Sequence, residues 1–574
     1  MKGRTGKNFY DSPAHIEYFL VGFVLLILGL YFIIAGRRFF DFDEFQVLYA
    51  SAAIARGKSF YVDGIENHFP LANLFLSVPV YLMGHDESIL LLSRYIIFIL
   101  NSIMLLYVYR IGSLLWSRIA GLLAVSSILV SVVFLQKGIE IRHDVFNALF
   151  NVMGAYYGFA FIKKNNSRYL VLSSLSFGMA LASTQKAIVM IAGFIIGLVV
   201  FLLRNKRYKT CVRIVLGYLS LIPVPLAVCL MVLITISNDN FEAFLQHAVI
   251  DVIIGYAPYT TEIYPFPYDR LSLFKNIFLG NILFYVLVFL GIVSNLCSIK
   301  DGKEEKVIIG IWAALGLAFY VTSKRPFYQT LLPAIPPIAL IAGGLLGNFW
   351  KYSLEWNRSK QFILSALIFA FLLILPLRYF KGNLIKDDRF ERALLNAAIC
   401  LENLESNEKT LCFTQNQLFF DPVFKMSNDE CGRRIYDFDV ECFKKRMIDA
   451  QCKIIINDYR TRLLNKEVKK RIAENYLSIE MGDILIPGFR VPPKKSIFKD
   501  VWIEGTYYSP IFSLELDGRK IEEKIFYLNK GHHTFLNPTT RPIMLVYIFK
   551  PHNLKTIPWI SPNKGYKRVN VRSE

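Results

Sequence analysis

The sequence is poor in charged residues, and the charge it carries is mostly of one sign. Only 19% of the 574 residues are Asp, Glu, Lys or Arg, below the roughly 25% of a soluble domain, which disfavours an ordinary soluble enzyme. Acidic residues are the scarcer sign, with 45 against 65 Lys and Arg, so the net charge is +20. With 8 Cys, 34 Gly and 23 Pro, the chain is neither a small disulfide scaffold nor collagen-like. A hydrophobic content of 54% excludes a disordered chain.

Long apolar runs are what the sequence has in abundance, and a helix that crosses a bilayer needs about 20 such residues. We predict eleven spans, near 17–36, 88–109, 115–135, 143–162, 168–184, 185–203, 212–236, 277–297, 306–322, 328–348 and 361–380. A shorter run at 70–84 contains Pro79 and better suits an interfacial helix, although it is a candidate for a twelfth span. The first run is too long for a cleavable signal peptide and predicts a retained helix.

The positive charge collects in alternate loops between these runs. Basic residues that share one side are Lys2, Arg4, Lys7, Arg110, Arg118, Lys163, Lys164, Arg168, Arg204, Lys206, Arg207, Lys209, Arg213, Lys300, Lys303, Lys306, Lys351, Arg358 and Lys360. By the positive-inside rule, this side is cytoplasmic, as is the N-terminus. An odd number of spans then places the chain after about residue 381 outside the cell. A nucleic-acid role is disfavoured, because the basic residues form no single patch.

The tail differs in kind from the apolar part. Residues 409–420 and 452–457 are typical of strands and 461–474 of a helix, which predicts an α/β domain over 381–490. After Pro492-Pro493 the pattern alternates, and Asp517-Gly518 is a hairpin signal, so we expect a small β-sandwich within 491–574. The tail holds Cys400, Cys412, Cys431, Cys442 and Cys452. These cysteines could form up to two disulfides in an oxidising exterior, or they could be small buried hydrophobic residues; the pattern fits both.

The fold class predicted is therefore a polytopic α-helical membrane protein of about 11–13 spans, residues 1–380, with an extracytoplasmic α/β plus β-sandwich tail. Its first outer loop, 37–87, is the richest in polar groups. Asp43 and Glu44 are paired carboxylates, suited to general-base chemistry or to a metal, or to capping the helix expected at 45–56. Glu66 and His68 follow in the same loop, and all four residues are candidate ligands of a divalent cation, although their spacing fits no metal motif.

Isolated cations and one further acid lie at the outer ends of later spans. Arg142 and Asp144 open the fourth span, and Asp144 is also a candidate helix cap. Lys186 stands between two spans that have almost no connecting loop, where a cation is costly unless it snorkels or meets an anion. Lys324, Arg325 and Tyr328 precede a Pro-rich span, and two cations beside a tyrosine suit a phosphate.

The ordered segments DFDEFQVLYASAAIARGKSFYVDGIENHFPL, EIRHDVFNALF, STQKAIVMIAG and YQTLLPAIPPIALIAG resemble a known family. The resemblance, over roughly residues 17–350, is to the polyprenyl-phosphate-sugar-dependent membrane glycosyltransferases of the C-type (GT-C) fold. This group includes protein O-mannosyltransferases and the aminoarabinose transferase of lipid A. Residues 516–535 resemble small carbohydrate-binding-like β domains appended to such enzymes.

The resemblance implies a role for each candidate residue. Asp43 would activate the acceptor hydroxyl, with Glu44 beside it, in an inverting displacement that releases a lipid phosphate. Arg142, Lys186, Lys324, Arg325 and Tyr328 would bind the donor phosphate. Asp144, Glu66 and His68 would serve the acceptor, a metal or the structure. The lipid A enzymes have Lys-Pro-Pro where this chain has Asn67-His68-Phe69-Pro70, a departure that argues against aminoarabinose transfer.

We therefore expect an integral membrane glycosyltransferase. Its co-substrate would be a polyprenyl-phosphate-linked sugar, its acceptor a lipid, glycan or protein, and its one further cofactor, if any, a divalent metal. A lipid-linked sugar flippase or an O-antigen polymerase is the alternative. A flippase would place its cations in a central cavity rather than at outer ends. A polymerase typically has Arg/His pairs in a large outer loop rather than an acidic first loop.

Overall fold

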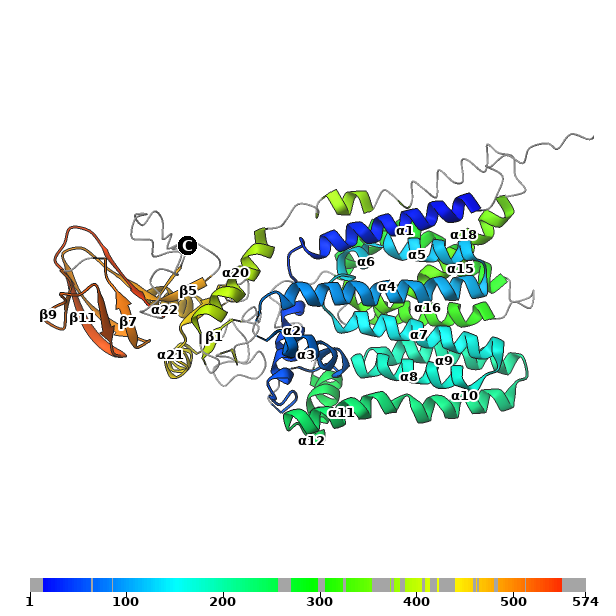
Figure 1. The fold of residues 1–574 in the computed structure, drawn as a ribbon, viewed down its shortest axis with the longest axis horizontal. Helices are drawn as coiled ribbons and strands as arrows, with labels where there is room; N and C mark the ends of the chain where they lie inside the picture. The colour runs from blue at the N-terminus through cyan, green and yellow to red at the C-terminus, as the bar shows by residue number, and fades with distance from the viewer. Residues whose placement is uncertain are drawn as a thin grey trace, which may run out of the picture.

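The chain folds into a bundle of long helices that is followed by a smaller tail of strands and short helices (Figure 1). The computed structural model describes residues 14–62, 66–84, 86–255, 270–297, 305–323, 327–353, 372, 376–381, 383, 388–404, 408–412, 421–422, 439–457, 461, 464–478, 484–510 and 513–549.

Within these residues, seven helices or helix combinations are long and apolar enough to cross a membrane. Four are single helices that match predicted spans closely: α1 (Ala14–Ala35), α4 (Ile89–Leu115), α7 (His143–Lys164) and α9 (Ala187–Arg204). A fifth is built from α10 (Tyr208–Leu221) and α11 (Pro223–Ser237), and the sixth is α16 (Glu305–Thr322). The seventh combines α17 (Tyr328–Leu331), η4 (Leu332–Ala334) and α18 (Ile335–Ser353). The chain is therefore a multi-pass membrane protein.

The other predicted spans take different forms. The 277–297 run falls within α14 (Arg270–Gly280) and α15 (Ile282–Cys297), a pair bent by 81° that counts as an eighth span if taken as one. The 168–184 run is α8 (Ser167–Ser183), of 17 residues. The 70–84 run is α3 (Leu71–Met83), only 13 residues long, as expected of a helix that does not span. Most of the 361–380 run lies outside the described residues.

The 115–135 run is the one that the structure breaks. It forms α5 (Arg118–Leu129) and α6 (Val132–Lys137), because Ser131 is extended and its hydroxyl accepts a hydrogen bond from the Phe134 amide, which starts a new helix. α5 is buried against α18 at a contact of small residues. A Cβ on Gly343 would lie 2.5 Å from the Ala124 nitrogen, so the two backbones are in direct contact.

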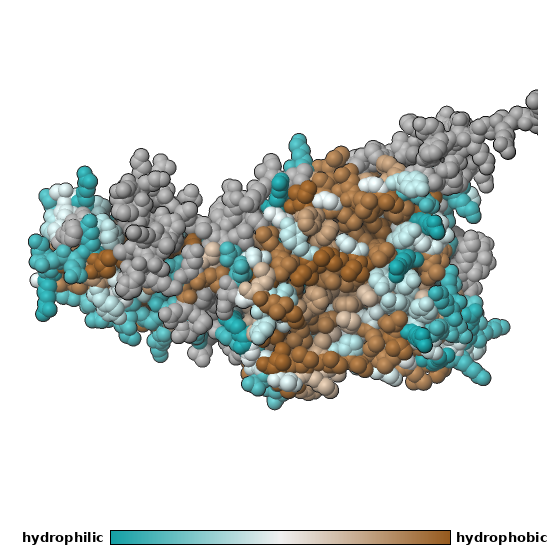
Figure 2. All heavy atoms as spheres, viewed as in Figure 1, coloured by the Kyte–Doolittle hydropathy of each residue, from teal (hydrophilic) through white to brown (hydrophobic). Residues whose placement is uncertain are grey.

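The outer surface of the bundle is apolar between its two ends (Figure 2). Large side chains of several helices are exposed there, among them Leu25, Leu219, Met231 and Phe289 at 64–69%. The turns that carry the basic clusters, α7–α8 and α9–α10, lie at the end of the bundle away from the tail, whereas α2 (Phe42–Ala55) and α3 lie at the end facing the tail (Figure 1). The first outer loop and the tail therefore share one side of the membrane.

Hydrogen bonds join the first outer loop to the end of α11 and the residues that follow it. Asp239 accepts hydrogen bonds from the amides of Phe60 and Tyr61 at 2.7 and 2.8 Å. The hydroxyl of Ser59 donates to the Ser237 carbonyl at 2.8 Å. Beyond this point lie α12 (Phe241–Phe244) and a π-helix, η2 (Leu245–Gly255).

The tail contains two sheets. One has the order β10-β7-β12-β5-β3-β1-β2, with β4 also paired to β5, and the other β6-β11-β8-β9. The strands are β1 (Lys409–Leu411), β2 (Asp421–Pro422), β3 (Ile454–Ile456), β4 (Tyr476–Ser478), β5 (Ile484–Val491), β6 (Lys495–Val501), β7 (Gly505–Tyr508), β8 (Glu515–Leu516), β9 (Arg519–Lys520), β10 (Ile525–Leu528), β11 (Gly531–Asn537) and β12 (Ile543–Tyr547), and the helices are α20 (Asp388–Asn403), α21 (Val440–Asp449) and α22 (Lys466–Asn475).

Strand β5 joins the two predicted parts of the tail, because it pairs with β3 on one side and with β12 on the other. Asp517 and Gly518 form the β8–β9 hairpin, with φ of 49° and 78°. Of the five tail cysteines, Cys400, Cys412 and Cys452 are buried free thiols. Cys442 is disulfide-bonded, and Cys431 lies outside the described residues.

Candidate active site

Asp43 lies in the first turn of α2, at a helix start that its two acidic neighbours build. Asp41 is the N-cap and accepts a hydrogen bond from the Asp43 amide at 3.2 Å, while Glu44 accepts one from the Asp41 amide at 2.8 Å. This reciprocal arrangement is a capping box. The cap therefore consists of Asp41 and Glu44, and the Asp43 carboxylate is left for another partner. Its side chain is 37% exposed.

Glu44 is buried and ion-paired within the bundle. Its two oxygens accept hydrogen bonds from Nε and Nη2 of Arg94 at 2.8 and 2.7 Å, and neither side chain has any exposed surface. Arg94 also donates to the carbonyls of Ala35, Arg38 and Phe39, at the end of α1. This geometry suits Glu44 to holding α2 in place rather than to contact with a substrate.

The partner of Asp43 is Arg142, which forms an ion pair with it. The Arg142 side chain is only 4% exposed and also pairs with Glu140 at 3.1 Å. Lys137 completes the cluster, 3.1 Å from Asp41 and 2.9 Å from Glu140. Burial would raise the pKa of Asp41, but Lys137 and Arg142 outweigh it and hold that pKa at about 2. Arg142 thus lies among carboxylates rather than open to a donor phosphate.

Of the two predicted site cations that the structure describes, Arg142 and Lys186, only Lys186 is accessible. Its side chain is 37% exposed, and its Nζ lies 3.8 Å from Asp144, which is 9% exposed. The next residue back, Gln185, donates to the carbonyls of Asn67 and Ala248, both at 2.6 Å. The turn that carries Lys186 is therefore fixed against the segment that carries Glu66 and His68. Tyr328 begins α17, whereas Lys324 and Arg325 lie outside the described residues.

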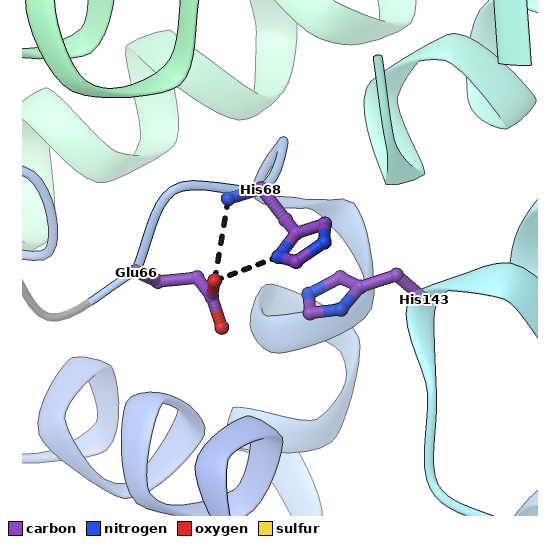
Figure 3. Close-up of side chains that lie close together, drawn as sticks. All are labelled: Glu66, His68 and His143. Atoms are coloured by element: carbon purple, nitrogen blue, oxygen red, sulfur yellow. Dashed lines mark hydrogen bonds and ion pairs between the residues drawn. The ribbon is translucent and has the colours of Figure 1, made fainter. Parts of the chain in front are cut away.

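Glu66 and His68 form a buried cluster with His143 (Figure 3). His68 Nδ1 lies 2.7 Å from Glu66 Oε1, and the two imidazole rings stack with centroids 4.4 Å apart. Burial would raise the pKa of Glu66, but His68 outweighs it and lowers that pKa to about 2. One ligand atom from each of the three residues lies within 4.8 Å of the others.

Three consecutive residues at the start of α7 connect these groups. Arg142 pairs with Asp43, His143 stacks on His68, and Asp144 pairs with Lys186. The candidate site is thus a single constellation around the N-terminus of α7, where the helix dipole adds positive potential. Arg142 and Asp144 were predicted as site residues, whereas the stacked position of His143 between them was not.

Sequence reasoning also missed Arg94, Lys137 and Glu140 as parts of this site. A signal existed for Arg94, since an arginine within the apolar run of α4 must find a partner. No comparable signal pairs Lys137 with Asp41, or Glu140 with Arg38, because pairing across that distance in the chain depends on helix packing.

The fold defines the class: the chain has the GT-C fold of membrane glycosyltransferases, as the sequence predicted. Residues 67–234 match the family described as dolichyl-phosphate-mannose-protein mannosyltransferase. No curated protein matches the chain by sequence.

Two solved structures illustrate the likeness. ArnT from Cupriavidus metallidurans bound to undecaprenyl phosphate is 13% identical, with a TM-score of 0.52. The match covers 82% of this chain and 98% of the ArnT chain. The Archaeoglobus fulgidus oligosaccharyltransferase tethered to an acceptor peptide is 10% identical, with a TM-score of 0.51. The match covers 81% of this chain and 74% of the oligosaccharyltransferase chain. At these identities the likeness is one of fold.

Proposed function

We propose that this protein transfers a sugar from a polyprenyl-phosphate donor to an acceptor outside the cell, with Asp43 as the general base. The observation that carries the proposal is the constellation around the start of α7. Asp43, which pairs with Arg142, is 37% exposed and more open than its neighbour Asp41 at 27%. Lys186, which pairs with Asp144, is a partly exposed cation in the same constellation. A displacement at a sugar phosphate requires a base for the acceptor and a positive charge for the leaving group.

In the proposed reaction, the acceptor hydroxyl gives its proton to the Asp43 carboxylate. Its oxygen forms a bond to the anomeric carbon, while the bond from that carbon to the phosphate oxygen breaks. The electron pair of the broken bond leaves with the polyprenyl phosphate, and Lys186 stabilises the negative charge. Attack opposite the leaving group inverts the anomeric configuration.

Arg142 and Glu44 act on Asp43 in different ways in this scheme. The ion pair with Arg142 holds the Asp43 carboxylate in one orientation. Glu44 fixes the helix start itself through Arg94. Both are therefore positioning residues, and Asp43 alone meets the acceptor.

The donor class and the side of the membrane each have separate support. ArnT has been solved with undecaprenyl phosphate and an archaeal oligosaccharyltransferase with dolichol-phosphate, both of them polyprenyl phosphates on this fold. The basic turns lie at the opposite end of the bundle from α2, the helix that carries Asp43 (Figure 1). By the positive-inside rule, that end is cytoplasmic and the site faces outward.

The test supplies purified wild-type protein with a labelled polyprenyl-phosphate hexose and follows release of the sugar. Asp43→Asn should abolish turnover, because the amide accepts no proton at neutral pH. Asp86→Asn is the matched control, since Asp86 is exposed in the same loop. Equal turnover in wild type and Asp43→Asn would refute the base assignment. No turnover with any monophosphate donor would refute the transferase and favour a polymerase or flippase.

A further inference from the structure

Four tyrosines form a continuous row across three helices at the end of the bundle away from the tail. The ring of Tyr107, in α4, lies 5.3 Å from that of Tyr156 and 5.9 Å from that of Tyr157, both in α7. Tyr157 in turn stacks on Tyr169, in the first turn of α8, at 6.4 Å. All four side chains are partly exposed. This tyrosine row therefore lies on the surface of the bundle and bridges α4, α7 and α8.

The hydroxyl groups of the tyrosine row keep hydrogens for a further partner. The hydroxyls of Tyr107 and Tyr157 lie 2.9 Å apart, so one of them donates to the other. The accepting hydroxyl still has its own hydrogen to donate. Lys164 Nζ donates to the Tyr169 hydroxyl at 3.2 Å, so the hydrogen of that hydroxyl is not used in this contact. The row thus offers O–H donors to an acceptor outside the protein.

Two cations lie directly on the tyrosine row. The guanidinium of Arg110 is 5.6 Å from the centre of the Tyr107 ring and 5.9 Å from that of Tyr156. Lys164 Nζ is 5.2 Å from the centre of the Tyr169 ring. Both cations are exposed. Contact with the rings holds each charge at the surface instead of leaving its side chain extended into solvent.

Acidic residues are almost absent around these cations. The sequence holds no Asp or Glu from residue 88 to 139 or from 145 to 238, stretches that include both basic turns. Lys163 forms an ion pair with Glu305 at 3.4 Å. Among the described residues, no carboxylate pairs with Arg110 or Lys164. The positive-inside rule accounts for the sign of this charge but not for its seat on a row of tyrosines, and an anion from outside the chain would complement it.

The neighbouring parts of α4 and α8 are apolar and exposed. Ile103 and Leu106 precede Arg110 by seven and four residues, so the three share one face of α4. Their side chains are 38% and 47% exposed, and those of Val171 and Leu172, in α8, are both 42% exposed. Figure 2 shows the apolar surface of the bundle giving way to hydrophilic residues at this end. The face therefore runs from exposed aliphatic side chains, past tyrosine hydroxyls, to cations.

We propose that this face of α4, α7 and α8 is a binding site for an anionic glycerophospholipid of the cytoplasmic leaflet. The acyl chains would lie on the aliphatic side chains, an ester carbonyl would accept from a tyrosine hydroxyl, and the headgroup phosphate would meet Arg110 and Lys164. Basic sites between membrane helices on the cytoplasmic side bind anionic headgroups in this way. A zwitterionic headgroup would instead bring its own ammonium group beside the two cations.

This site is separate from the one proposed for sugar transfer. It lies at the opposite end of the bundle from α2, the helix that carries Asp43 (Figure 1). The proposal therefore goes beyond the proposed function and does not depend on it. An inactive protein that binds the lipid would refute only the transferase.

The test measures lipid binding to the full-length protein in detergent by native mass spectrometry. Phosphatidylglycerol is the probe, and phosphatidylcholine with the same acyl chains is the reference. Wild type should bind a phosphatidylglycerol molecule more tightly than phosphatidylcholine. Arg110→Gln and Lys164→Gln should each weaken the binding of phosphatidylglycerol about fivefold, the contribution of one cation near an anionic membrane surface. Neither variant should change the binding of phosphatidylcholine.

Arg207→Gln and Lys209→Gln are the matched controls, because both cations are exposed at the start of α10 and neither belongs to the tyrosine row. Both should bind phosphatidylglycerol as wild type does. Each variant changes an exposed side chain, so its thermal unfolding in lipid-free detergent should match that of wild type. An equal loss of affinity in the controls would show general charge attraction and overturn the site. Equal affinity of wild type for the two lipids, or undiminished binding in Arg110→Gln and Lys164→Gln, would overturn it as well.

Discussion

Replacement of Arg94 by methionine removes the cation that fixes α2, the helix that carries the candidate base Asp43, to the bundle. The guanidinium makes two hydrogen bonds to Glu44 and three to carbonyls at the end of α1. It also lies 3.8 Å from the centre of the Phe40 ring. The variant leaves the Glu44 carboxylate buried with neither solvent nor a cation.

The expected cost follows from that burial. Loss of one partner of a fully buried ion pair destabilises a protein by about 3–5 kcal/mol. For a chain of this size, we expect the midpoint of thermal unfolding to fall by a few degrees. Glu44→Gln combined with Arg94→Met removes the buried charge altogether, so the double variant should be more stable than Arg94→Met alone.

Thermal unfolding in detergent measures this directly. Arg118→Met is the matched control, because Arg118 is exposed at the start of α5, at the end of the bundle away from the site. Arg94→Met should also lower sugar transfer, since α2 presents Asp43. A midpoint equal to that of Arg118→Met, or a double variant less stable than the single one, would refute the reasoning.

Three other predictions follow from the structure. Lys186→Met should raise the KM for donor about tenfold or more, whereas Lys186→Arg should retain most activity; an unchanged KM would remove Lys186 from the phosphate site. Burial outweighs Glu474 and Asp500 and lowers the pKa of Lys499 to about 8. Lys499→Met should therefore stabilise the tail by about 1–3 kcal/mol near pH 7, with the gain shrinking as pH rises from 8 towards 10.5, and a pH-independent difference in unfolding would contradict this. A cysteine at the exposed position 522 should react with an impermeant thiol reagent on intact cells; reaction only after permeabilisation would reverse the topology.

Much of the bundle could be predicted because a membrane-spanning helix is recognised in a sequence by the length of its apolar run. The runs of α1, α4, α7 and α9 matched to within a few residues at most of their ends. The break after Leu129 could not be predicted in this way. A single serine that caps a new helix hardly changes the mean hydropathy of an apolar run. Ser131 interrupts such a run here without adding charge.

The sequence predicted which residues form the site better than it predicted which of them pair with one another. An acidic first loop and cations at outer ends indicate polar chemistry at one membrane face, and the structure places Asp43, Glu66, His68, Asp144 and Lys186 around the start of α7. Which carboxylate is buried and which is exposed depends on Arg94 and Arg142, whose partners are chosen by helix packing. The position of His143 against His68 depends in the same way on how α7 meets the loop before α3.

The most direct test of the central claim is sugar transfer by the purified protein in detergent, from a labelled polyprenyl-phosphate hexose. Wild type and Asp86→Asn should release polyprenyl phosphate and form a glycosylated product of inverted anomeric configuration. Asp43→Asn should form none while unfolding at the same temperature. Transfer by Asp43→Asn at the wild-type rate, or a product of retained configuration, would contradict the account.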